Sequence, residues 1–232
     1  MKLLFALLFI VLLVVTITRW RTLRRRRAEF IAAYPYRQFL DRRLAARRPE
    51  LSAAQRELVF DGLRQYFQIC GEAKKRFVAM PSQVVDDAWH EFILFTRHYQ
   101  EFCQRGLGRF LHHTPAEAMR TPTAAQDGIK RAWRLACRQD EIDPKTPQKL
   151  PLLFALDAML AVHGGFVYRL DCLAAAAAGK STYCAGHIDC GGGCSGGGGC
   201  GSDASAGDSG GCGGGGCGGG GAVHSALRKM GI

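Results

Sequence analysis

The first eighteen residues constrain this chain more than any other segment. Leu3 to Thr18 form an apolar run of sixteen residues without a charge or a helix breaker, and six arginines follow between Arg19 and Arg27. As a helix, such a run spans roughly 24 Å, slightly less than the ~30 Å hydrocarbon core of a bilayer. Trp20 can sit at the interface and arginine side chains can extend to the headgroups, so the run is long enough to cross a membrane.

A cleaved signal peptide is the alternative interpretation of this run. Only Lys2 supplies a preceding charge, and no small-x-small cleavage site follows the apolar residues. The arginine cluster that does follow favours retention on the cytoplasmic side. We therefore predict an uncleaved single-pass anchor in the plasma (inner) membrane, with the N-terminus outside and the rest of the chain in the cytoplasm.

The positive charge is concentrated beside the apolar run. The formal net charge is +11, and between Arg19 and Glu50 there are eleven arginines against three acids, a balance of 11 − 3 = +8. A basic patch can indicate nucleic-acid binding, but this placement favours attraction to anionic lipid headgroups. The predicted partners are the lipid bilayer and an unidentified protein, and we expect no nucleic acid.

Composition divides the chain into three parts. We predict an anchor with its basic flank at residues 1–27, a helical domain at 28–178 and a flexible tail at 179–232. Residues 184–221 hold 20 of the 29 glycines and 6 of the 10 cysteines, so they offer few side chains to bury. In a reducing cytoplasm these cysteines would be free thiols, metal ligands or redox-active groups, whereas in an exported chain they would form disulfides.

Apolar spacing predicts an all-α domain, because strand-like alternation is scarce. The pattern indicates five helical segments: 28–46 with a kink or break at Pro35, a helix from an N-capping Ser52 to Cys70, a long helix over 84–105, and shorter ones over 123–139 and 150–162. Cys70, Cys103 and Cys137 fall on apolar faces, which predicts that they are small buried residues.

The densest group of reactive side chains lies around residue 90. Asp86 and His90 are four residues apart and share a helix face, and His112 or His113 can supply a third ligand. Three protein ligands and an open position describe a site for zinc or another divalent transition metal. In the alternative interpretation Asp86 caps the start of a helix and the histidines only tie down nearby polar groups.

Three functions remain open from the residues alone. The leading hypothesis is a non-enzymatic binding or assembly module that presents the Asp/His cluster, with Trp89 and Tyr99 as binding residues, at or near a pocket. The second is a metal-dependent enzyme or metal-binding protein that uses this cluster. The third is a metal or redox sensor built from the cysteines of the tail. The sequence contains no phosphate-binding loop, nucleophile elbow, HExxH motif or paired CxxC motif.

Residues 81–115 resemble the core motif of the glycine-rich domain-containing-protein-like family, whose pattern is approximately VDxxWHxxIL, then a tyrosine and a cysteine, then GxFLHH. The matching positions are Val85, Asp86, Trp89, His90, Ile93, Leu94, Thr96, Tyr99, Cys103, Gly108, Phe110, Leu111, His112 and His113. The resemblance implies a helical domain to which these residues matter, and no activity. The family pattern often has a histidine where this chain has Phe92, so a site centred on residues 90 and 92 is not expected. The glycine- and cysteine-rich end also resembles that of bacterial membrane proteins with an N-terminal anchor.

Overall fold

The computed structural model describes every residue except 114–121, 172–181, 187 and 189–232. Within the described part the chain forms seven α-helices, one π-helical turn and two short strands, which confirms the predicted all-α class. Most of the predicted tail, including five of its six cysteines, lies outside the described residues.

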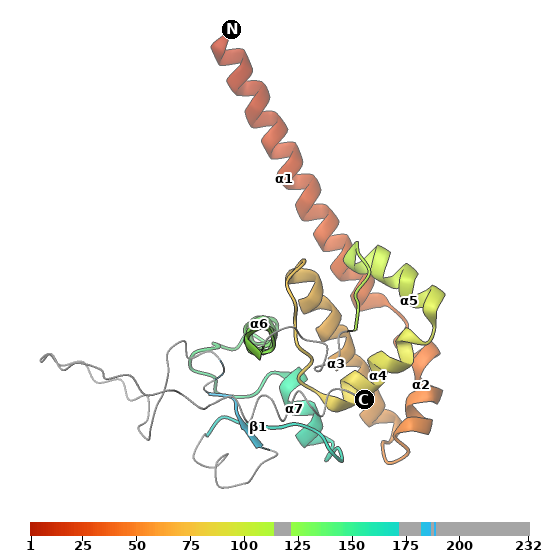
Figure 1. Cartoon of the computed structure of the whole chain (residues 1–232). Coiled ribbons are helices and arrows are strands. Elements are labelled where there is room, and N and C mark those ends of the chain that lie inside the picture. Colours follow the sequence, from red (N-terminus) through yellow and green to blue (C-terminus); the bar gives the residue numbers. More distant parts are fainter. Residues whose placement is uncertain (114–121, 172–181, 187, 189–232) are drawn as a thin grey trace, which may run out of the picture.

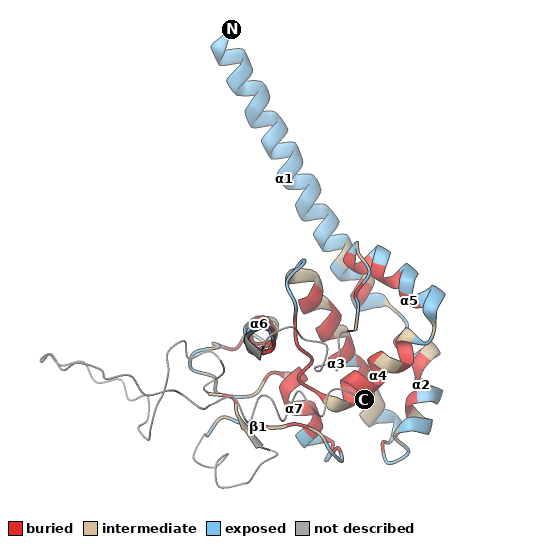
Figure 2. Ribbon diagram, in the orientation of Figure 1, coloured by how far each residue is buried: buried red, intermediate tan, exposed pale blue. Residues whose placement is uncertain are grey.

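Helix α1 (Lys2–Ala33) projects from the domain and is exposed along most of its length (Figures 1 and 2). It is long and apolar enough to cross a membrane, with a mean hydropathy of 2.5 over its most apolar window, although an N-terminal signal sequence meets the same criterion. Its last turn belongs to the domain, because Ile31 is only 2% exposed. The helix therefore continues without a break across the predicted boundary between residues 27 and 28.

A close approach of backbones attaches α1 to the domain. A Cβ atom on Gly106 would lie 2.9 Å from Cγ1 of Ile31, so only glycine lets the π-helical turn η1 (Cys103–Leu107) pack this tightly against α1. Beside this contact the Phe30 and Phe102 rings lie 6.0 Å apart, centroid to centroid. The apolar helix thus joins the domain through packed side chains and not through a linker.

Helix α3 (Ala53–Glu72) is the centre of the domain. Five other helices pack against it: α1, α2 (Tyr36–Arg47), α4 (Gln83–Ile93), α6 (Pro122–Gln139) and α7 (Leu152–Met159). The predicted cap is confirmed, because Ser52 Oγ accepts a hydrogen bond from the Gln55 amide at 3.3 Å and the Gln55 side chain accepts one from the Ser52 amide at 2.8 Å. The predicted interruption at Pro35 is also present, as the end of α1 before α2 begins.

The prediction of one long helix over 84–105 is wrong. The chain forms α4 (Gln83–Ile93), turns, and continues as α5 (Thr96–Phe102) and η1. The Phe92 and Phe102 rings lie 5.2 Å apart, whereas ten residues along a straight helix would separate them by about 15 Å. Folding the apolar stripe onto itself lets both rings reach one core, which a single straight helix cannot do.

The C-terminal part of the domain adds α6 (Pro122–Gln139), α7 (Leu152–Met159) and a small parallel pairing of β1 (Val167–Arg169) with β2 (Thr182–Cys184). This strand pair was not expected, and β2 lies beyond residue 178. The predicted burial of Cys70, Cys103 and Cys137 as free thiols is confirmed. Cys184 is disulfide-bonded, whereas the cytoplasmic prediction favours free thiols.

Asp157 on α7 holds the start of α4. Its buried carboxylate accepts hydrogen bonds from the Ser82 hydroxyl and from the amides of Gln83, Val84 and Phe166, at 2.7–3.1 Å. Burial raises the pKa of this carboxyl, and these four donors oppose the rise. Asp157 therefore fixes where α4 begins and, with it, the position of every residue on that helix.

We expect Asp157→Ala to lower the free energy of unfolding by about 3 kcal/mol, because it leaves several buried donors without an acceptor. The measurement is thermal or denaturant unfolding of the full chain in detergent. Asp61→Ala, which removes an exposed carboxylate, is the control and should change stability little. Equal stability of the two variants would contradict the role given to Asp157.

Candidate metal centre

Helix α4 carries three buried carboxylates with different partners. Asp87 lies 3.0 Å from an Arg47 nitrogen and 2.6 Å from an Arg48 nitrogen, and Glu91 lies 2.5 Å from Arg43. These ion pairs join α4 to α2 and to the residue after it. Asp86 is 3% exposed and, among the residues that the structure describes, contacts no lysine or arginine.

Asp86 faces two imidazole rings instead. Its Oδ1 lies 3.1 Å from Nε2 of His113, and its Oδ2 lies 3.6 Å from Nδ1 of His90. One ligand atom from each of the three residues falls within 4.8 Å of the others. Around a tetrahedral zinc ion with bonds of about 2.1 Å, neighbouring ligand atoms are roughly 3.4 Å apart. The three side chains are therefore spaced closely enough to bind one ion.

His90 has a ring nitrogen that the protein leaves unused. Its Nδ1 is buried and has no hydrogen-bond partner among the described residues. Burial lowers the pKa of His90 below its ordinary value, while the neighbouring Asp86 acts in the opposite direction. The ring is therefore neutral at pH 7, and it directs a free lone pair or an unsatisfied N–H toward Asp86.

A chain of hydrogen bonds brings His113 to this position. The Trp89 indole N–H donates to the Tyr99 hydroxyl at 3.0 Å, and that hydroxyl donates to the Leu111 carbonyl at 2.5 Å. The Trp89 and His113 rings then pack with their centroids 4.7 Å apart. Trp89 and Tyr99 thus hold residues 109–113 against α4. Both were predicted as binding residues, but only Trp89 lines the cavity described below.

His112 lies outside the three-ligand group. Its side chain is exposed and packs against the Phe110 ring, with 4.8 Å between centroids. Of the two adjacent histidines proposed as a third ligand, the structure brings only His113 to Asp86 and His90.

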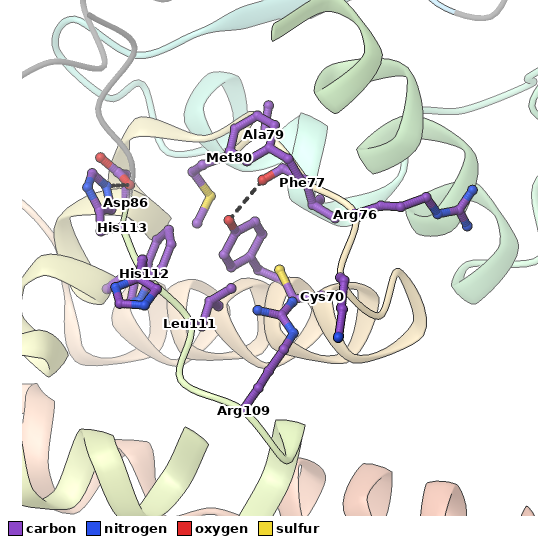
Figure 3. A pocket seen from close by; sticks show the side chains of 14 residues that line it. Cys70, Arg76, Phe77, Ala79, Met80, Asp86, Arg109, Leu111, His112 and His113 are labelled. Atoms are coloured by element: carbon purple, nitrogen blue, oxygen red, sulfur yellow. Dashed lines mark hydrogen bonds and ion pairs between the residues drawn. The ribbon is translucent and has the colours of Figure 1, made fainter. Parts of the chain in front are cut away.

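A cavity of about 210 Å³ adjoins the cluster, with Asp86 and His113 at one end (Figure 3). Tyr66, Cys70, Met80 and Leu111 supply much of its apolar lining. Burial raises the pKa of the Cys70 thiol to about 12, so this thiol stays protonated and is a poor nucleophile. The reactive groups of the cavity are therefore its imidazoles and its carboxylate.

The basic side chains on the opposite wall of this cavity were not predicted from the sequence. Lys75, Arg76 and Arg109 line it, from the segment after α3 and from the segment after η1. Lys75 and Arg109 are 34 residues apart by their numbers, and no periodicity links them. Only the adjacency of Arg109 to the predicted His112-His113 pair offered a signal.

The region that matches a known protein family has nearly the same bounds as the folded domain. Residues 26–188 match the UCP032817-like family, which is more than half of the chain. The chain belongs to this family. The UCP032817-like segment runs from the end of α1 past β2 and includes Asp86, His90 and His113, and the family name states no activity. No curated protein and no solved structure matches the chain. The resemblance to the glycine-rich domain-containing-protein-like family stays a prediction.

We expect Tyr99→Phe to destabilise the protein by about 1–3 kcal/mol, because the Trp89 N–H and the Leu111 carbonyl lose their buried partner. Thermal unfolding of the full chain in detergent is the measurement. Tyr34→Phe is the matched control, since no hydrogen bond of the Tyr34 hydroxyl joins it to another described residue. If both variants unfold together with the wild type, the hydrogen-bond chain does not hold residues 109–113.

Proposed function

We propose that this protein is a membrane-anchored metal-binding module whose helical domain holds one divalent transition metal ion through Asp86, His90 and His113. The observation that carries the proposal is the buried, unpartnered Nδ1 of His90 beside a buried carboxylate. A metal ion would use this nitrogen and neutralise the carboxylate at the same time.

The charges of α4 support this proposal. Asp87 and Glu91 on the same helix are each neutralised by arginines, whereas Asp86 has only two imidazoles, one of which has a lowered pKa. A buried carboxylate without a cation is unfavourable by several kcal/mol in a typical protein interior. Asp86 is therefore the position on α4 where a cation from solution would be bound most favourably.

The ligand types indicate which ions fit. Two imidazole nitrogens and one carboxylate oxygen suit zinc, and the same set with open positions suits iron(II). Calcium and magnesium prefer sites made only of oxygen ligands. We propose zinc as the first ion to test.

A metal-dependent enzyme is the second candidate. Three protein ligands leave coordination positions free, and Asp86 and His113 both line the cavity, where a substrate would have access. The binding module remains the leading proposal, because the observation that carries it, the buried and unpartnered Nδ1 of His90 beside Asp86, indicates a bound ion and no particular reaction. The third hypothesis, a sensor built from the tail cysteines, rests mostly on residues that the structure does not describe.

Membrane attachment is part of the proposed function. An uncleaved anchor is supported by the continuity of α1 into the core, since removal of the apolar run would cut one helix close to its packed end. The arginines after the apolar run support a cytoplasmic domain. The Cys184 disulfide is an argument for the opposite orientation, because disulfides form readily only in oxidising compartments.

We expect the full chain, purified without added metal, to contain about one equivalent of zinc or another transition metal by elemental analysis. His90→Ala should lose it, because one of three ligands is removed. His98→Ala and His112→Ala are matched controls: both remove an exposed histidine outside the cluster, and both should keep the metal.

A chain that ends at residue 188 separates this site from the tail, because it keeps the helical domain and removes five tail cysteines. Retention of the metal in this chain supports the Asp/His site. Loss of the metal in this chain, with no effect of His90→Ala, would refute the proposed site and indicate the cysteines.

We expect a C-terminal fusion of alkaline phosphatase to be inactive in intact cells and a green fluorescent protein fusion at the same position to be fluorescent. The reason is that the arginine cluster holds the domain in the cytoplasm, where phosphatase cannot form its disulfides. An active phosphatase with a dark fluorescent fusion would reverse the proposed orientation.

A further inference from the structure

Three basic residues line the cavity, and no described acidic side chain pairs with them. Lys75, Arg76 and Arg109 line it together with one carboxylate, Asp86, which gives a formal balance of 3 − 1 = +2. No acidic side chain of the described residues lies within ion-pair distance of any of the three. Most other arginines of the α2–α4 region form such pairs, so this cavity concentrates positive charge that the protein does not neutralise.

Arg109 is the cation that points into the cavity. Its guanidinium lies beside Cys70, while Arg76 extends from the rim toward α6 (Figure 3). Arg109 is half-buried, and among the described residues its guanidinium donates only to the carbonyl of its neighbour Phe110, at 3.4 Å. A guanidinium has five N–H donors in a fork that matches phosphate and carboxylate oxygens, so an anion in the cavity would satisfy donors that are now unused.

The cavity segments lie beside the part of α1 that follows its apolar run. The Lys74 ammonium lies 5.3 Å from the centre of the Trp20 ring, and Trp20 directly follows the apolar run and its first arginine. On the other side of the opening, the Arg27 guanidinium lies against Gly108, next to Arg109. In a helix that spans a membrane, tryptophan and arginine just beyond the apolar run occupy the headgroup layer. The segment after α3 and the segment after η1, which both line the cavity, would then lie next to the headgroups.

Exposed aromatic rings accompany these cations. Phe77 follows Arg76 and is 36% exposed, and Phe110 follows Arg109 and is 38% exposed. Basic residues beside exposed aromatic rings are typical of surfaces that rest on a bilayer, where the rings enter the interface and the cations contact anionic headgroups. Figure 1 shows the segment after α3 near the end of α1 at which the helix enters the domain.

We infer that this cavity binds the phosphate of an anionic phospholipid headgroup from the bilayer that α1 crosses, with Arg109 pairing with the phosphate and Lys75 and Arg76 at the opening. The cavity of about 210 Å³ accommodates a headgroup and leaves the acyl chains outside. The inference goes beyond the metal site and does not require it, because the cationic residues and the Asp/His ligands are different side chains.

The test uses the full chain in a non-ionic detergent, titrated by calorimetry with three probes: short-chain phosphatidylglycerol, short-chain phosphatidylcholine and glycerol phosphate. We expect phosphatidylglycerol to bind at one equivalent and more tightly than the other two. Arg109→Gln should weaken this binding at least tenfold, and Arg109→Lys, which keeps the charge and loses the fork, should weaken it less. Arg97→Gln is the matched control, since Arg97 is exposed and outside the cavity, and it should bind as the wild type does.

Two results would overturn the inference. Equal affinity of phosphatidylglycerol for the wild type and Arg109→Gln would show that the lipid binds elsewhere. Glycerol phosphate binding as tightly as phosphatidylglycerol would assign the cavity to a soluble phosphate ester in place of a lipid. Metal content measured on the same samples keeps the two proposals apart, because a metal-free chain that still shows the Arg109 dependence would refute only the metal site.

Discussion

The turn between α4 and α5, closed by the hydrogen bonds from Trp89 to Tyr99 and from Tyr99 to Leu111, is the constraint on which the rest of the structure depends. It folds one apolar stripe back on itself, so that Phe92 and Phe102 share a core with α3. It also ties residues 109–113 to α4. Without this turn His113 would not reach Asp86, and the cavity would lack the wall that carries Arg109.

The same turn links the apolar helix α1 to the candidate site. Beyond α5 the chain forms the π-helical turn η1, whose Gly106 packs against Ile31 at the end of α1. The segment after η1 then carries Arg109 and His113 in succession. A single stretch of about ten residues thus contacts α1, lines one end of the cavity and supplies His113 to the Asp/His cluster. Because side chains in such interfaces are closely packed, the position of α1 and the shape of the cavity are coupled.

The two proposals use one cavity with opposite charges at its two ends. Asp86 and the imidazoles attract a cation, and Arg109 with the basic rim attracts an anion. Met80 and Leu111 belong to the apolar lining of the same cavity. A buried Asp/His cluster at one end of a cavity and basic side chains at the other distinguish this domain from a bundle whose polar groups are all neutralised.

The sequence by itself determined the elements whose causes are local. The apolar run fixed α1, Ser52 and Gln55 fixed the start of α3, and helical spacing identified the buried faces, including those of Cys70, Cys103 and Cys137. The spacing of Asp86 and His90 on one helix was also visible from the residues. Only the tertiary structure decided that the predicted helix over 84–105 is broken, because the energy gained by packing Phe92 edge-to-face against Phe102 in a core shared with α3 depends on residues distant in the chain. For the same reason, only the tertiary structure showed that His113 and not His112 lies beside Asp86, and that Arg109 lies at the other end of the cavity. Both placements depend on which side chains meet in space, and local periodicity carries no information about such contacts.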